Sequence, residues 1–370
     1  MIGRGLAHCF VLVVAMCSIF GVTLSAQQDP QEPTEVPRPK TETDAQPAVH
    51  GKLVRWLELQ NATLNLRYRF VDTTEGVTTT NQLQHRESLR ARVKFDSRGR
   101  YSLNFGVFTG VRFTSGWDNT GWGINVAQKN LAFKALYLDV RPITEIEVEV
   151  GGLYIVRGKS TEVTTYDEDG YIMGERLTVR RPSALFFDEI TFTNAYFVSD
   201  PRTISVGDRF RHIDEPNYQH FLLQKNLGER GGISADYTVE TGARTWRQAV
   251  ALNVRELRFL DSIIFENYQR TNRTPAYGFA VTMRRMVHPR VALDTGYASI
   301  DRDYGGLNAD RFNIGRRAFA MATYTISPEF LASMFITTPV GRNGPLPQRT
   351  LMNLVFTYNA LPALKRTGLF

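Results

Sequence analysis

The charged residues of this chain that could act together stand at every second position in short segments. The basic row consists of Arg67, Arg69, Arg90, Arg92 and Lys94, with Arg112 following in the next segment, and the acidic row consists of Glu145, Glu147 and Glu149. Because successive side chains of an extended strand point to opposite sides, each row lies on one face of its strand. If both rows line one water-filled constriction, the field between them orders dipolar or charged solutes.

The residues between these charges are apolar, which predicts strands with one apolar and one polar face. Residues 62–70 place Ala62, Leu64, Leu66, Tyr68 and Phe70 on one side and Thr63, Asn65, Arg67 and Arg69 on the other. The same alternation recurs in residues 88–95 and 233–240. Strict alternation of this kind is typical of half-buried β-strands.

The N-terminus carries the pattern of an export signal. Residues 1–26 contain Arg4, a long apolar run and the ending Leu24-Ser25-Ala26, at which signal peptidase is expected to cut. A lipid-modified Cys17 is disfavoured, because Met16 is too large for that motif. Both cysteines leave with the signal, so the mature chain forms no disulfide. Residues 27–50 are rich in proline and poor in large apolar side chains, which predicts a disordered periplasmic tether.

Nothing in the mature chain approaches the roughly 20 consecutive apolar residues that a membrane-spanning helix requires. Connections alternate in length instead. Short ones are predicted at 96–100, 141–144, 199–202, 227–230, 256–258, 288–290 and 327–329, and longer polar ones at 71–86, 114–129, 156–182, 301–311 and 339–348. Short turns on one rim and long loops on the other are typical of outer-membrane barrels.

Counting the runs between these connections predicts sixteen strands within residues 51–360, followed by a tail at 361–370. They start near residues 57, 87, 101, 130, 145, 184, 203, 218, 231, 246, 259, 276, 290, 312, 329 and 349. Most hold about ten residues, close to the 9–11 that a tilted strand needs to cross the hydrocarbon layer. The expected fold is all-β, a transmembrane antiparallel up-and-down barrel. One segment leaves an alternative open, because Val250, Val254 and Leu257 also fit a helical spacing.

The charged rows have a simpler alternative to solute selection. Arginines and glutamates on one inner wall can pair with one another and keep the wall hydrated. The basic row is the larger, so the selectivity interpretation favours anions or acidic organic solutes. Charges in the lumen of a barrel tune selectivity, whereas charges on its lipid face disrupt it.

The sequence gives little support for a metal site or a catalytic site. The acidic segments at 167–170 and at Asp301, Asp303 and Asp310 lack the spacing of known calcium loops, so solvated loops are expected there and no metal site. No Gly-x-Ser-x-Gly, His-Glu-x-x-His or phosphate-binding loop occurs, so we expect no enzyme and no cofactor. A hydrolase site assembled across strands stays open, because such partners need not be adjacent in sequence.

In these patterns the chain resembles bacterial outer-membrane porins. The resemblance covers roughly residues 55–360 and lies in Leu-Arg-Tyr-Arg-Phe at 66–70, Leu-Arg-Ala-Arg-Val at 89–93 and Ala-Leu-Tyr-Leu-Asp-Val-Arg-Pro at 135–142. The Arg-x-Arg strands are similar to those of alginate-export-like porins, which implies passive diffusion of anionic solutes through an arginine-lined pore. The ending departs from that pattern, because the terminal Phe370 follows Pro362 and the basic pair Lys365-Arg366.

These observations predict a porin in the cell outer membrane of a Gram-negative-type envelope, with both termini periplasmic. Its expected partners are membrane lipid and small hydrophilic solutes, with no nucleic acid, and a homotrimer is compatible with such a barrel. The loop at 156–182 is expected to fold inward and narrow the pore. Two alternatives remain at this point: a narrow or plugged barrel whose outer loops bind a ligand or surface partner, and a secreted soluble β-sandwich.

Overall fold

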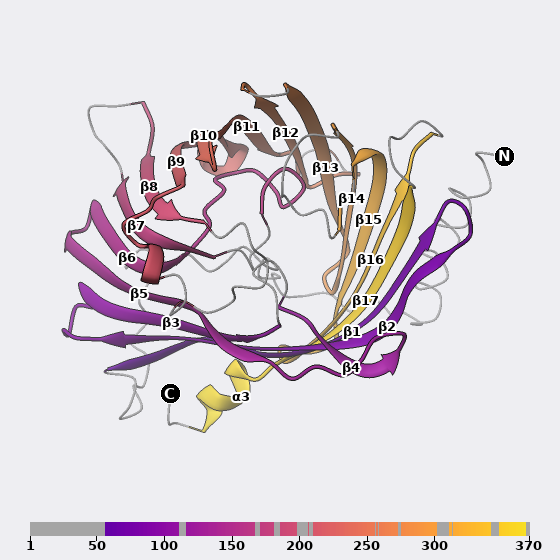
Figure 1. Cartoon of the computed structure of the whole chain (residues 1–370), viewed down its shortest axis with the longest axis horizontal. Helices are drawn as coiled ribbons and strands as arrows, with labels where there is room; N and C mark the ends of the chain where they lie inside the picture. Colours follow the sequence, from indigo (N-terminus) through magenta and orange to yellow (C-terminus); the bar gives the residue numbers. More distant parts are fainter. Residues whose placement is uncertain are drawn as a thin grey trace.

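Antiparallel strands close into a ring in the computed structural model of this chain (Figure 1). The structure describes residues 56–110, 116–166, 171–180, 186–197, 206, 210–255, 257, 259–272, 275–301, 311–312, 314–341 and 348–367. The predicted signal peptide and tether therefore lie outside the described residues. None of the helices in the described part of the chain is long and apolar enough to cross a membrane.

The strands follow the chain in order around the ring. They are β1 (Leu57–Thr73), β2 (Thr78–Lys94), β3 (Tyr101–Thr109), β4 (Asp118–Gly123), β5 (Leu131–Ile143), β6 (Ile146–Tyr154), β7 (Tyr171–Arg180), β8 (Glu189–Tyr196), β9 (Tyr218–Asn226), β10 (Gly231–Glu240), β11 (Ala243–Asn253), β12 (Ser262–Arg270), β13 (Ala276–His288), β14 (Val291–Ile300), β15 (Gly315–Thr325), β16 (Phe330–Pro339) and β17 (Arg349–Asn359). β1 pairs with both β2 and β17, which closes the ring.

The predicted barrel and its sixteen strands are confirmed, with β4 as a short addition. β3 pairs with residues 88–94 of β2 and also with β5, whereas β4 pairs with residues 82–85 of β2. β4 therefore extends the position of β3 toward one rim and does not add a further strand to the ring. A sandwich of two separate sheets is excluded by this closure.

The count of sixteen was reached through two errors that offset each other. β7 lies inside the segment 156–182 that was predicted to be a loop, because Tyr171, Ile172 and Met173 are all fully buried and give no alternation. The strand predicted to start at residue 203 begins outside the described residues, and the described residues Phe210–His212 form a 3-10 helix, η2.

Two further predictions are corrected or settled by the strand bounds. The loop predicted at 71–86 is wrong, because β1 continues to Thr73 and β2 already starts at Thr78. This part of the hairpin is rich in threonine and polar on both faces, so it lacks an apolar period although its β-branched residues favour strands. The helical alternative around residue 254 is also wrong, since β11 and β12 pair there as antiparallel strands.

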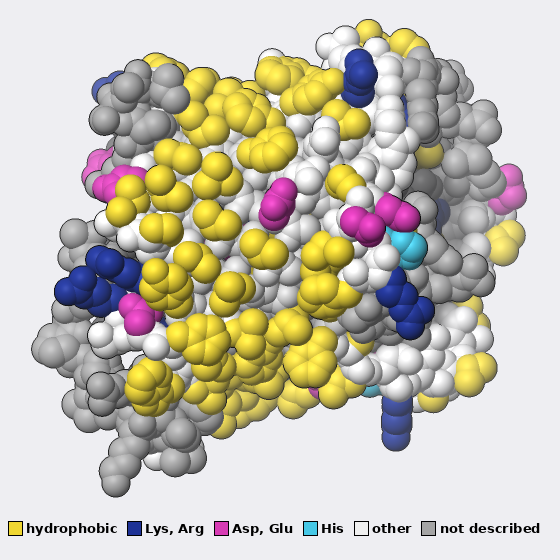
Figure 2. Space-filling view, turned by 60° about the vertical axis from the view of Figure 1, so that its left-hand side comes forward, with side chains coloured by type: hydrophobic (Ala, Val, Ile, Leu, Met, Phe, Trp, Pro, Cys, Tyr) yellow, Lys and Arg dark blue, Asp and Glu magenta, His cyan; other side chains and the backbone are white. Residues whose placement is uncertain are grey.

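The two faces of the strands have opposite character. On β1, Leu64 and Leu66 are 50% and 41% exposed, whereas Arg67 and Arg69 are only 3% and 7% exposed. Figure 2 shows hydrophobic side chains covering most of the outer face that carries β5 to β8. The barrel therefore has an apolar exterior and a polar interior, the arrangement that lets strands span a bilayer.

The connections divide between two rims. Short turns join β2 to β3, β5 to β6, β9 to β10, β13 to β14 and β15 to β16 on one rim, which we call the short-turn rim. Connections on the opposite, long-loop rim include 124–130, 155–170, 197–217 and 301–314. The short connection predicted at 199–202 lies outside the described residues, within the link between β8 and β9. β1 begins and β17 ends at the short-turn rim.

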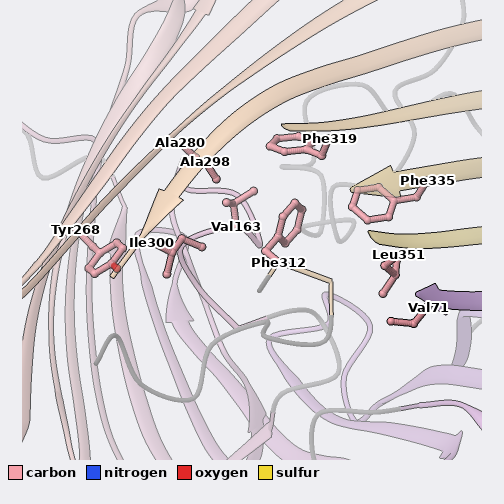
Figure 3. Packing of buried hydrophobic residues seen from close by; sticks show 10 residues of the cluster. All are labelled: Val71, Val163, Tyr268, Ala280, Ala298, Ile300, Phe312, Phe319, Phe335 and Leu351. Carbon is pink, nitrogen blue, oxygen red and sulfur yellow. The ribbon is translucent and has the colours of Figure 1, made fainter. Parts of the chain in front are cut away.

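Part of the interior is filled by loops that pack on the wall. Figure 3 shows an apolar cluster in which Val163 and Phe312, both from loops, meet residues of the inner wall. The ring of Phe312 contacts those of Phe319 and Phe335, with centroids 5.1 and 5.5 Å apart. Phe319 of β15 points inward, so Ala318, Ala320 and Ala322 lie on the outer face of that strand. Burial of these rings fixes the loops against β14 to β17.

A short helix, α3 (Leu361–Arg366), follows β17 within the predicted C-terminal tail. Arg366 Nη1 donates a hydrogen bond to Glu329 Oε1 at 2.5 Å, in the turn between β15 and β16. Glu329 also accepts a bond from Ser327 Oγ at 3.0 Å. The helix is thus tied to the short-turn rim through the partly buried carboxylate of Glu329.

We expect the attachment of α3 to weaken in acid. The bonds from Arg366 and then Ser327 hold the pKa of Glu329 below its usual value of 4.5, because they favour the carboxylate. The stabilisation is therefore present above about pH 4.5 and is lost as the pH falls through the lowered pKa. Hydrogen exchange of the Leu364 amide, which bonds to Ala360 O, should lose protection in Glu329→Gln at pH 7, as it should in the unmodified protein once the pH falls below the lowered pKa of Glu329. Equal protection in both proteins at pH 7 would contradict this attachment.

Candidate functional site

The basic row lies on the inner face of two adjacent strands. β1 and β2 pair so that Arg67 stands opposite Gln84 and Arg69 opposite Gln82. Arg90 and Arg92 follow on β2 toward the short-turn rim, and each is 8% exposed. Their neighbour in sequence, Leu89, is 39% exposed on the outer face. Period-2 alternation therefore places all four guanidinium groups on one side of this two-strand segment.

Neutral and aromatic partners hold two of these arginines. Arg67 donates from Nε and Nη2 to Gln84 Oε1 at 2.9 and 2.6 Å, and its guanidinium carbon lies 4.0 Å from the ring centroid of Trp117. Arg90 lies over Tyr154 and Phe108, at 4.7 and 5.2 Å from their ring centroids. Contacts with ring faces stabilise a cation without neutralising it. The positive charge of these two positions is thus fixed in place.

The remaining basic residues are placed differently. Arg92 donates to Ser102 Oγ at 2.9 Å and to Gly99 O at 2.6 Å, and its Nη2 lies 3.7 Å from Asp139 Oδ2. Lys94, at the end of β2, pairs with Glu58 at 2.8 Å. Arg112 lies outside the described residues.

The acidic row is bound to arginines of its neighbouring strands. Glu147 pairs with Arg141 of β5 and Arg180 of β7, and Glu149 pairs with Arg176 of β7 at 2.8 Å. Glu145 lies in the turn before β6 with its side chain exposed, so it is not part of the inward face. The two inward glutamates therefore pair with arginines of the same wall. This is the arrangement expected if the charged rows neutralise each other instead of selecting solutes.

Sequence reasoning missed these arginine partners. Arg176, Thr178 and Arg180 stand at alternate positions of β7, with Leu177 and Val179 between them, and this alternation of polar and apolar residues was the available signal. It was lost because β7 had been included in a predicted loop. Arg141 was placed in a turn, whereas β5 continues to Ile143.

A further inward arginine on β15 was also missed. Arg317 is fully buried, and it donates to Thr337 Oγ1 at 3.0 Å, to Gln348 Oε1 at 3.5 Å and to the Arg349 carbonyl. All three acceptors are neutral. In sequence it stands beside Arg316, so the pair did not show the alternation that marks the basic row.

The connection between β6 and β7 runs into the barrel (Figure 1). Its described residues 155–166, which we call the inner loop, bond to inward side chains of three consecutive strands. Lys159 N donates to Ser234 Oγ of β10 at 2.8 Å, and Arg247 Nε of β11 donates to Thr164 O at 2.9 Å. Tyr166 Oη donates to Glu240 Oε1 of β10 at 2.6 Å, and Thr161 N donates to Glu266 Oε2 of β12 at 2.9 Å. The inner loop therefore lies against β10 to β12 and narrows the interior.

No group of three or more metal-ligating side chains occurs in the part of the chain that the structure describes. The acidic segment 167–170 and residues Asp303 and Asp310 lie outside that part. The site is therefore defined by its charges and by the inner loop.

No family model and no curated protein matches this sequence. Solved structures do match its fold. Salmonella typhi OmpF, in complex with daunomycin, aligns with a TM-score of 0.53 and 12% identity over 82% of this chain and 97% of its own. A mutant Rh. blastica porin aligns with a TM-score of 0.51 and 10% identity, over 82% and 99%. Pseudomonas putida OprB aligns with a TM-score of 0.50 and 8% identity, over 83% and 93%.

Proposed function

We propose that this chain, which has the fold of the bacterial porins, forms a pore through which small hydrophilic solutes diffuse across the outer membrane. The observation that carries the proposal is the closed ring of sixteen strands with an apolar coat and a charged interior. A barrel of this size encloses more space than its own inward side chains fill, so it leaves an aqueous channel. The proposal assigns diffusion to this chain and no catalysis.

The arrangement of charges supports a preference for anions. The basic residues Arg67, Arg69, Arg90 and Arg92 gather on the inner face of β1 and β2, whereas Glu147 and Glu149 are each paired with arginines of their neighbouring strands. A wall rich in arginine raises the local concentration of anions in the water beside it. Small anions and acidic organic solutes are the proposed cargo.

The rims support an orientation. Outer-membrane barrels have short turns on the periplasmic side, and here β1 starts and β17 ends on the short-turn rim. We therefore place both termini in the periplasm, which agrees with export through an N-terminal signal. Lipid contacts the apolar coat, and a homotrimer of such barrels is compatible with it.

Single-channel recording in planar bilayers tests the pore. Protein produced from residue 27 and refolded in detergent should insert with discrete conductance steps and a reversal potential that favours anions. Folded protein, recognised by faster migration before boiling than after, that yields no steps would overturn the proposal. Steps that favour cations would retain the pore and remove the anion preference.

One observation favours a second function, a narrow barrel whose outer loops bind a ligand. The inner loop and Phe312 pack against the wall and fill part of the interior. Such a barrel would leave liposomes impermeable to small sugars and amino acids. Deletion of residues 302–310 should then abolish ligand binding without changing permeability. Permeable liposomes would exclude this alternative.

A further inference from the structure

A single buried carboxylate of the wall receives three hydrogen bonds from the inner loop. Glu266 of β12 is 3% exposed. Its Oε2 accepts bonds from Thr161 N at 2.9 Å and Thr164 Oγ1 at 2.6 Å, and its Oε1 accepts a bond from Thr161 Oγ1. The loop and the carboxylate are separated by 105 and 102 residues in sequence. The contact is therefore made by the closed barrel and not by local structure.

Among the residues that the structure describes, the hydrogen-bond partners of Glu266 are these donors of the inner loop. Its cross-strand neighbours are Ala249 of β11 and Ala280 of β13, each 1% exposed. Alanine side chains carry no donor, and their small size opens a recess in which the longer carboxylate meets the loop. A buried carboxylate needs such bonds, because burial without partners is strongly unfavourable.

The loop presents its donors in one compact turn. Thr164 N bonds to Thr161 O at 3.4 Å and Thr165 Oγ1 bonds to the same carbonyl at 2.9 Å. This turn brings both threonine hydroxyls toward the same carboxylate. Ser234 and Arg247 bond to backbone atoms of the loop, whereas Glu266 bonds to the hydroxyl groups of Thr161 and Thr164 as well as to a backbone amide. The carboxylate therefore fixes which residues of the loop face the wall.

We propose that Glu266 is a positioning residue that holds the inner loop across the barrel and thereby sets the cross-section of the pore. This inference rests on the proposed function, since a cross-section matters only if solutes pass. Three hydrogen bonds of the turn converge on this one side chain, so it carries the polar attachment of the turn to β12. Without it, the loop keeps its bonds to Ser234 and Glu240 of β10 and to Arg247 of β11, and the turn is released from β12.

Single-channel recording on substituted proteins tests the role of Glu266. In Glu266→Ala the conductance should rise roughly twofold and fluctuate between levels, because the current through an aqueous channel scales with its open cross-section. Glu266→Gln, which keeps one acceptor oxygen, should give an intermediate rise. The matched control is Glu175→Gln, which removes an exposed glutamate of β7 and should leave conductance unchanged. Each variant must first show the gel shift of a folded barrel.

A disulfide separates positioning from any electrostatic role of the carboxylate. Both cysteines of the chain, Cys9 and Cys17, precede residue 27, so the double variant Thr164→Cys/Glu266→Cys carries a single pair. Oxidation should restore the original conductance and its steadiness, and reduction should raise conductance to the Glu266→Ala level. The restored protein lacks the carboxylate, so its recovery would show that position alone is required.

Two outcomes would overturn the inference while leaving the pore intact. These are an original conductance in Glu266→Ala and a high conductance that persists after the disulfide has formed. If the unmodified protein itself gives no steps, the proposed function fails instead. The two claims therefore fail through different measurements.

Discussion

Arginine in place of Leu354 is expected to destabilise the barrel by about 2–4 kcal/mol, the cost of a basic side chain facing lipid near the middle of the bilayer. Leu354 is the central residue of β17, and it pairs with Tyr68 of β1 and Met334 of β16 on the outer face. Phe356, on the same face, is 50% exposed. The free energy of unfolding in urea, measured in lipid vesicles, gives the difference directly.

An inward substitution on the neighbouring strand provides the matched control. Ser333 of β16 lies on the face of Phe335 and Thr337 and is partly exposed to the interior. Ser333 pairs with Val355, the residue next to Leu354. Ser333→Arg therefore adds the same side chain at nearly the same depth, but on the face that points into the barrel. Its free energy of unfolding should change by less than about 1 kcal/mol, in line with the tolerance of lumen positions. Equal losses in both variants would contradict the assignment of the two faces.

Alanine at both Arg67 and Arg90 should reduce the ratio of anion to cation permeability about fivefold. At roughly 8 Å from the solute, one charge in water contributes about 0.2 kcal/mol after screening in 0.1 M salt, so two charges attract an anion by about 0.5 kcal/mol and repel a cation by the same amount, a difference of about 1 kcal/mol between the two ions. The ratio of anion to cation permeability falls accordingly. The reversal potential in a salt gradient across a planar bilayer measures that ratio.

Lysine at the same two positions separates charge from geometry. Arg67→Lys/Arg90→Lys keeps both charges while losing the two bonds to Gln84 and the planar contact with Tyr154, so most of the preference should remain. A second control, Arg244→Ala/Arg316→Ala, removes two exposed arginines at strand ends and should leave the ratio unchanged. An unchanged ratio in the double alanine variant would remove the basic row from the proposed selectivity.

Alternation predicted the strands wherever an apolar outer face and a polar inner face differ. β1, β10 and the pair β11 and β12 were recognised for that reason, and the closed barrel followed from their number. The signal fails where a strand is buried on both faces, as at Tyr171 to Met173, or polar on both, as in residues 78–86 of β2. Period-2 patterns record a difference between two environments, and these segments have none.

The candidate site was predictable in part for the same reason. The inward direction of Arg67, Arg69, Arg90 and Arg92 follows from alternation alone. Their partners do not, because Trp117, Gln84 and Tyr154 come from other strands and loops whose register the sequence does not specify. Glu266 was missed altogether, since its role depends on a turn that lies more than one hundred residues away in the chain.

The pairing of β1 with β17 has a consequence for how this protein is made. Thr357 Oγ1 donates to Asn65 Oδ1 at 2.7 Å across 292 residues, so β1 gains its second neighbour only when β17 has been synthesised. Until then two unpaired strand edges and an exposed apolar surface promote aggregation. A chain that ends before β17 therefore cannot close the ring, and both of its edges stay unpaired.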